Sequence, residues 1–211
     1  ALVPIFMYQD IEEQHVLEYV TPAKDDVFVT DDGVWYMRID KPRPDAVAPP
    51  WLSEGEDGQW LERLGLPEAE TGLPQRVTED DNGNYHVARG LAANNRRIMT
   101  QFEDLSRRYP EQFEEHFGEA NYENLEEALL LGRQVYTGEG CWHCHSQFIR
   151  PVSNESRRWG EVSETWEYQN ELQRPVMFGT RRVGPDLSRE GGRRSNDWHA
   201  VHFYEPTLVS T

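Results

Sequence analysis

The chain has 211 residues, a formal net charge of −17 at pH 7 and a mean hydropathy of −0.80. Its 37% of hydrophobic residues, with seven Trp, nine Tyr and eight Phe, argue against a fully disordered chain, and its length allows one large domain or two small ones. The negative charge argues against nucleic acid and anionic lipid as partners, because both are bound through clustered Lys and Arg. The apolar run at residues 1–8 is far shorter than the roughly 18 residues that cross a bilayer.

The first 50 residues contain the pattern of a β-hairpin. Residues 1–20 predict the end of an apolar element followed by an acidic helix or loop. Residues 27–30 and 34–39 have the composition of strands, and Asp31-Asp32-Gly33 between them is a turn sequence. Residues 41–50 contain four prolines and predict an irregular connector.

Helical patterns are the main feature between residues 53 and 117. The apolar spacing of residues 53–66 predicts a short helix, and the polar, acidic and turn-rich residues 68–84 predict a loop. Residues 91–117 predict a long helical region that is broken at Pro110. Its apolar face consists of Ile98, Phe102, Leu105 and Tyr109.

Charge divides the chain near residue 121. Positions 1–121 hold 25 acidic and 11 basic residues, whereas positions 122–211 hold 13 acidic and 10 basic residues, and all ten of these are Arg. We therefore expect two domains, at 1–121 and 122–211. The second part begins with a helix that Gly138 and Gly140 end, and a further short helix is expected at 195–204 with Ser195 as its N-cap.

The most specific motif in the chain is Cys141-Trp142-His143-Cys144-His145. Two cysteines three positions apart on one turn can add to the two vinyl groups along one edge of a porphyrin, and the following His then projects its imidazole towards the iron. This spacing is that of c-type haem attachment, and His is a standard proximal haem ligand. The motif therefore predicts one covalently bound haem c, with electron transfer as its function.

Three competing roles are open to the two cysteines. A redox dithiol needs a thioredoxin-like βαβ context, which the pattern lacks. A zinc site, in a non-haem metal-binding or interaction module, would combine Cys141 and Cys144 with His199 and His202, across a gap far longer than in zinc fingers. The third role is that of two buried structural cysteines, which the preceding helix and its glycine stop disfavour.

A second segment fits the same chemistry. Gly184-Pro185-Asp186-Leu187 follows the motif, and a proline carbonyl could accept the ring N–H of His145, fix its tautomer and raise its basicity. The same four residues also fit an ordinary turn.

The second part of the chain resembles the mono-haem cytochrome c subunit of cbb3-type haem–copper oxidases, the FixO family. The resemblance covers roughly residues 122–211, although Trp159 stands where the family usually has Tyr. The matching motifs are Gly132-Arg133-Gln134-Val135-Tyr136, Glu139-Gly140-Cys141, Cys144-His145-Ser146-Gln147, Ile149-Arg150-Pro151, Arg158-Trp159-Gly160, Gly179 to Leu187, Gly191-Gly192 and Trp198-His199.

The resemblance implies a mainly α fold, in which a cytochrome c-like haem domain is preceded by an inserted acidic α+β region. It implies attachment of haem through Cys141 and Cys144, His145 as the proximal iron ligand and Pro185 as its support. It places the domain at the periplasmic face of the bacterial inner membrane, on an anchor helix outside this chain. Its haem would relay electrons from a di-haem subunit or a donor cytochrome c to the catalytic subunit of the respiratory oxidase, without a catalytic centre of its own.

Three features depart from the family. Residues 1–7 resemble the segment that leaves the membrane anchor, but the anchor is absent, and residues from about 20 to 118 resemble an insertion. The family continues with a Ser-x-Met-Pro segment, whose Met is the second axial ligand, and we expect that Met to lie beyond Thr211. Within the chain the sixth ligand is unknown: Met177 is one candidate, and His199 and His202 are weaker ones.

Overall fold

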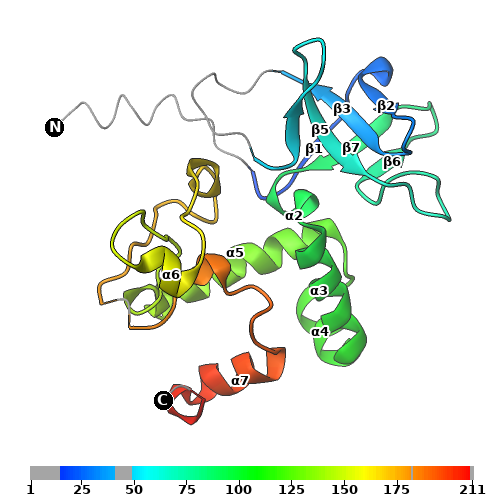
Figure 1. Cartoon of the computed structure of the whole chain (residues 1–211). Coiled ribbons are helices and arrows are strands. Elements are labelled where there is room, and N and C mark those ends of the chain that lie inside the picture. Colours follow the sequence, from blue (N-terminus) through cyan, green and yellow to red (C-terminus); the bar gives the residue numbers. More distant parts are fainter. Residues whose placement is uncertain (1–14, 41–48, 182, 210–211) are drawn as a thin grey trace. The chain divides into compact units, whose positions relative to one another are not determined.

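The computed structural model describes residues 15–40, 49–181 and 183–209, and these form two compact units (Figure 1). The first unit comprises residues 1–134 and 165–174, and the second comprises residues 135–164 and 175–211. The segment 1–7, most of the proline-rich connector and Arg182 lie outside the described residues. The domain boundary near residue 121 stays a prediction.

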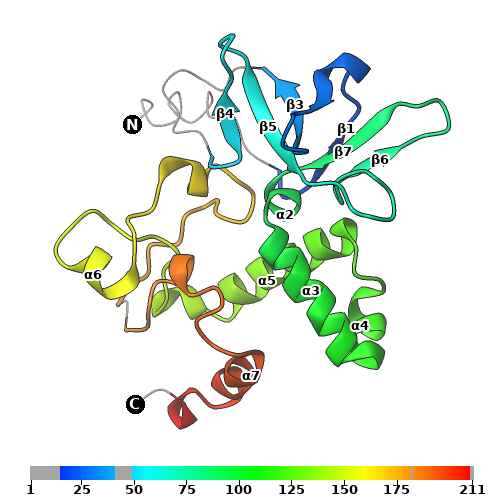
Figure 2. The same cartoon turned by 45° about the vertical axis from the view of Figure 1, so that its right-hand side comes forward.

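The N-terminal part of the first unit consists of two antiparallel sheets, and the expectation of a mainly α fold is therefore wrong (Figure 2). Helices account for 38% of the structure and strands for 16%. One sheet has the order β1-β7-β6, with β1 at Glu18–Val20, β6 at Val77–Glu79 and β7 at Tyr85–Arg89. The other has the order β2-β3-β5-β4, with β2 at Val27–Val29, β3 at Trp35–Ile39, β4 at Leu52–Glu54 and β5 at Trp60–Gly65.

The hairpin predicted at residues 27–39 is confirmed as β2 and β3. Gly33 has a φ of 79°, and the Thr30 N–H donates to the Val34 carbonyl (3.0 Å) across the turn. A positive φ costs glycine nothing, whereas any side chain at Gly33 would strain the turn.

The helix predicted at residues 53–66 is wrong, because this segment forms the antiparallel strands β4 and β5. Along β5 the buried residues are Glu62 and Leu64, with exposed Arg63 between them, which is the period of a strand. The buried position at Glu62 is charged, so a search for apolar spacing does not detect it. The loop predicted at residues 68–84 is also wrong in part, because it contains β6.

Glu62 belongs to a buried cluster of charged and polar groups that connects the two sheets. Its carboxylate accepts hydrogen bonds from Arg76, from Nε of Arg89 at 2.7 Å and from Asn94 at 3.2 Å. Burial alone would raise the pKa of Glu62, but the positive charges of Arg76 and Arg89 outweigh burial and hold that pKa below its usual value. Arg76 is also satisfied by the Ala88 carbonyl at 3.0 Å.

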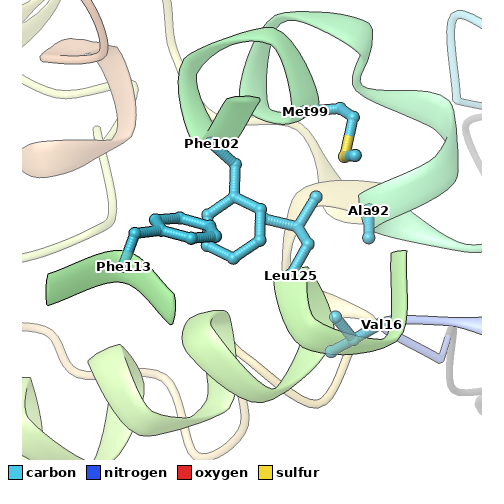
Figure 3. Close-up of a cluster of buried hydrophobic side chains, with 6 residues drawn as sticks. All are labelled: Val16, Ala92, Met99, Phe102, Phe113 and Leu125. Carbon is cyan, nitrogen blue, oxygen red and sulfur yellow. The ribbon is translucent and has the colours of Figure 1, made fainter. Parts of the chain in front are cut away.

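The helical region predicted at residues 91–117 is confirmed, including the break at Pro110. It consists of α2 (Leu91–Asn94), α3 (Arg96–Arg108) and α4 (Pro110–Phe117). Pro110 lies in the first turn of α4, where no backbone donor is needed. With α5 (Tyr122–Gly138), these helices enclose a core of Val16, Ala92, Met99, Phe102, Phe113 and Leu125 (Figure 3).

The second unit contains the end of α5, the short helix α6 (Glu155–Trp159) and α7 (Asn196–Tyr204). Ser195 caps α7 as predicted, and its hydroxyl accepts the Trp198 N–H at 3.2 Å. Short 3-10 turns lie at Cys141–His143, Leu187–Arg189 and Pro206–Leu208, with two more in the first unit at Lys24–Asp26 and Thr165–Tyr168. Among the described residues, no helix combines the length and the apolar character that a bilayer span requires.

Candidate haem site

Both cysteines of the motif lie in a tight turn that follows α5. Gly140 precedes the turn with a φ of 69°, a left-handed conformation that glycine adopts without strain. In the turn, the Cys141 carbonyl accepts hydrogen bonds from the N–H groups of Cys144 (3.2 Å) and His145 (3.0 Å). Both thiols are free, with Cys141 half-buried and Cys144 exposed. The structure therefore keeps the two thiols and His145 within one turn of backbone.

The backbone of this turn is fixed by a second segment, residues 180–187. Four consecutive carbonyls, from residue 143 to residue 146, each accept at least one hydrogen bond. The His143 carbonyl accepts from the N–H groups of Thr180 and Arg181 (both 3.0 Å), and the Cys144 carbonyl accepts from the Gly184 N–H (3.1 Å). The His145 carbonyl accepts from the Tyr136 hydroxyl (2.7 Å), and the Ser146 carbonyl accepts from the Leu187 N–H (2.7 Å). Because three of the four carbonyls take donors from residues 180–187, the two segments are held together.

The imidazole of His145 is oriented by its contacts on the same segment. Its Nδ1 lies 2.9 Å from the Pro185 carbonyl oxygen, so Nδ1 carries the proton and donates it. The other ring nitrogen, Nε2, is then the one that can bind a metal. Gly184 lies against the ring so closely that a Cβ there would overlap three of its atoms, with Nε2 at 2.6 Å. The hydrogen bond expected from the His145 ring N–H to the Pro185 carbonyl is thus present, while iron binding by His145 stays a prediction.

A buried pair lies directly beyond this contact. Ser146 and Asp186 are each 1% exposed, and the Ser146 hydroxyl donates to Oδ1 of Asp186. Because Ser146 follows His145 and Asp186 follows Pro185, this pair reinforces the same junction one residue further along both segments.

The described part of the second unit has few buried apolar side chains of its own. Among its described hydrophobic residues, only Tyr136 and Ile149 belong to the buried set, at 9% and 0% exposure. The large hydrophobic residues that it leaves exposed are Val135, Val152, Phe178, Val183, Val201, Phe203, Tyr204 and Leu208. A unit of this kind needs another apolar body to bury such side chains. Together with the free thiols and the oriented His145, this distribution fits a covalently held porphyrin.

Helix α7 places one of the other candidates near His145. The ring centre of His202 lies 6.0 Å from that of His145, and the two rings are nearly perpendicular at 86°. Trp198, one turn earlier, stacks on His202 with ring centres 5.0 Å apart and an angle of 10°. Burial lowers the pKa of His202, and the positive charges that His145 and His199 can carry lower that pKa further. His199 itself contacts Trp198 and Phe203.

The remaining candidates are less well placed. Met177 is half-buried in the second unit. Within the part of the chain that the structure describes, no group of three or more His, Cys, Asp or Glu residues is arranged to hold a metal ion. The four residues of the possible zinc site, Cys141, Cys144, His199 and His202, are therefore not assembled into one.

Two residues that fix the site are not recognisable as site residues from the sequence. Tyr136 belongs to a helix face and Gly184 to a turn, yet one donates to the His145 carbonyl and the other makes room for the His145 ring. Neither contact can be predicted from the neighbouring residues, because Tyr136 lies 9 positions and Gly184 lies 39 positions from His145 in the sequence.

A cysteine turn followed by a His whose ring N–H binds a carbonyl is the arrangement that a c-type cytochrome uses. Residues 110–211, just under half of the chain, match the family model described as "Cytochrome C oxidase, mono-heme subunit/FixO". This match supports the family resemblance and, with it, a role in electron transfer as a cytochrome c oxidase subunit that has a single haem. It does not extend to the acidic sheets of the first unit. No curated protein matches the chain.

Proposed function

We propose that the second unit binds one haem c covalently and transfers electrons as a subunit of a cbb3-type oxidase. The observation that carries this proposal is the hydrogen bond between Nδ1 of His145 and the Pro185 carbonyl, because it leaves Nε2 as the ring nitrogen that could bind an iron. The thiols of Cys141 and Cys144, three positions apart on one turn, would form the two thioether bonds.

When bound, a haem would supply one-electron chemistry between the ferrous and ferric states of its iron. The protein holds the imidazole of His145 rigidly, since its ring is fixed by Pro185 and Gly184 and its carbonyl by Tyr136. The Pro185 carbonyl keeps the proton at Nδ1, so that Nε2 would be the nitrogen that holds the iron. The exposed apolar side chains of the unit would cover a bound porphyrin and exclude water from it.

The partners in this proposal are the catalytic and di-haem subunits of the oxidase and a donor cytochrome c, at the periplasmic face of the inner membrane. The two units differ in charge, which is consistent with different roles for them in this proposal. The first unit holds 30 acidic and 13 basic residues, whereas the second holds 8 of each. The side chains of the second unit therefore carry no net formal charge, and any steering of a basic donor would come from the first unit.

The test is production of the chain in a host with c-type maturation machinery, followed by denaturing gel electrophoresis with a haem stain and a pyridine haemochrome spectrum. We expect one haem per chain that stays attached after denaturation. The double variant Cys141→Ala/Cys144→Ala should lose it, whereas His143→Ala should keep it, because His143 lies in the same turn and bonds to Thr180 instead. A haem-free chain with stoichiometric zinc would overturn the proposal in favour of a zinc or interaction module.

A further inference from the structure

The carbonyl that accepts the His145 ring N–H belongs to the peptide unit that joins Pro185 to Asp186. Its oxygen lies 2.9 Å from Nδ1 of His145. Because a peptide unit is planar, this oxygen keeps its direction only if the residues on both sides of the unit are held. The ring of Pro185 restrains one side, since it fixes φ. The direction of the oxygen therefore depends on what holds Asp186.

Asp186 is held through its side chain, and not in the way that its position predicts. It is the N-cap of the short 3-10 turn at Leu187–Arg189, where an Asp side chain ordinarily accepts a backbone N–H, yet among the described residues of this turn it caps none. Its Oδ1 instead accepts the hydroxyl of Ser146, 40 positions away. Both residues are 1% exposed, so this contact lies in the interior of the second unit.

Ser146 is itself held in place directly after the proposed iron ligand. Its carbonyl accepts the Leu187 N–H at 2.7 Å, and its hydroxyl oxygen accepts the Phe148 N–H at 3.4 Å. The hydroxyl that holds Asp186 therefore belongs to a fixed residue next to His145. The peptide unit that bonds to the imidazole is thus tied back to the segment that carries this imidazole.

We infer that Asp186 is a positioning residue for the haem iron, because its bond to Ser146 sets the direction of the Pro185 carbonyl. The inference rests on the proposed function, since it needs a haem whose iron is held by His145. A carbonyl that accepts the proton at Nδ1 would make the imidazole a stronger electron donor, which favours the ferric state. Loss of the bond between Ser146 and Asp186 would loosen this carbonyl and raise the reduction potential.

The experiment measures the reduction potential of the haem-loaded chain by a spectroscopic redox titration. Asp186→Ala should raise this potential, and the equilibrium constant for reduction should increase by up to about fivefold, the factor that corresponds to one hydrogen bond of ordinary strength. Ser146→Ala keeps the carboxyl group and should shift the potential in the same direction. The double variant should shift it no further than either single variant, because both substitutions remove the same bond.

Asp186→Asn separates the position of the side chain from its charge. Asn keeps an oxygen that can accept the Ser146 hydroxyl, so this variant should have the potential of the parent chain. A second measurement is the exchange of the Nδ1 proton of His145 with deuterium, followed by proton NMR of the oxidised protein. Exchange should be faster in Asp186→Ala and in Ser146→Ala, and unchanged in Asp186→Asn. A bond that only stabilised the fold would lower Tm and change neither measurement.

Ser188→Ala is the matched control. The Ser188 hydroxyl is buried and has no hydrogen-bond partner among the described residues, so its removal should leave the potential unchanged. If Asp186→Ala takes up no haem, Ser146→Ala carries the test alone.

Two results would overturn the inference. The first is an Asp186→Asn potential that follows that of Asp186→Ala, because charge and not position would then act on the iron. The second is an unchanged potential in Ser146→Ala. In both cases the parent chain still carries its haem, and the proposed function stands. A parent chain without covalent haem would instead refute the proposed function, and this inference with it.

Discussion

Replacement of Gly184 by Ala tests how closely the backbone must approach His145. The added Cβ would overlap Cε1, Nδ1 and Nε2 of the imidazole, with Nε2 at 2.6 Å. Ordinary contacts between such atoms are about 3.5 Å, so the ring or the backbone must move by at least roughly 1 Å, and by more to clear Cε1, the nearest of the three atoms. The ring cannot move freely, because Nδ1 bonds to Pro185, and neither can the backbone, because the Gly184 N–H bonds to the Cys144 carbonyl at 3.1 Å.

Overpacking of this kind costs about 1–3 kcal/mol, and a weakened hydrogen bond to Pro185 adds about 1 kcal/mol. For a domain of this size, a loss of about 2 kcal/mol lowers Tm by roughly 10 °C. Thermal unfolding followed at the haem Soret band measures this loss, and the haem content per chain measures attachment.

The matched control for this substitution is Gly191→Ala, because a Cβ at Gly191 meets nothing within 4 Å. We expect Gly191→Ala to keep the Tm and haem content of the parent chain. If Gly184→Ala also keeps both, the close approach to His145 has no energetic role and the reasoning fails.

Two further substitutions test other contacts. Tyr136→Phe removes the 2.7 Å hydrogen bond to the His145 carbonyl, so thermal unfolding should show a loss of about 1–2 kcal/mol, while the haem spectrum should not change; an unchanged Tm would contradict this. Glu62→Gln leaves the buried charge of Arg76 without its partner, and urea unfolding at pH 7 should show a loss of about 3–5 kcal/mol in the first unit. The pKa of Glu62 lies below its ordinary 4.5 in the folded state, so its stabilisation is complete above pH 4.5 and is lost as the pH falls through the lower folded-state pKa. Glu62→Gln should flatten this acid dependence, and an equally steep loss in the variant would refute the assignment.

Local chemistry explains which parts of the fold the sequence predicts. The β2–β3 hairpin is predictable because Asp31, Asp32 and Gly33 favour one kind of turn, and the break before α4 is predictable because proline cannot continue a helix. Strand β5 is not predictable in this way. Its buried position at Glu62 acquires its partners, Arg76 and Arg89, only when the two sheets come together.

The same distinction applies to the candidate site. The cysteines and His145 are neighbours in sequence, so their spacing alone indicates their chemistry. The Pro185 contact is predictable because proline has no N–H of its own but keeps a carbonyl that can accept the ring N–H of His145. The approach of His202 to His145 is not, since it depends on where α7 lies within the unit, which no residue pattern encodes.

The scarcity of buried apolar side chains around Tyr136 and Ile149 has a consequence for how the protein is made. If a prosthetic group supplies the missing interior, cofactor attachment becomes the last step of folding for the second unit, as metal binding is for zinc fingers. The first unit has two hydrophobic clusters of its own and does not depend on that step. Chains that escape attachment would therefore be half-folded, and proteases would remove them before they could assemble with a partner. Failure in haem supply would then lower the amount of this protein rather than its activity per molecule.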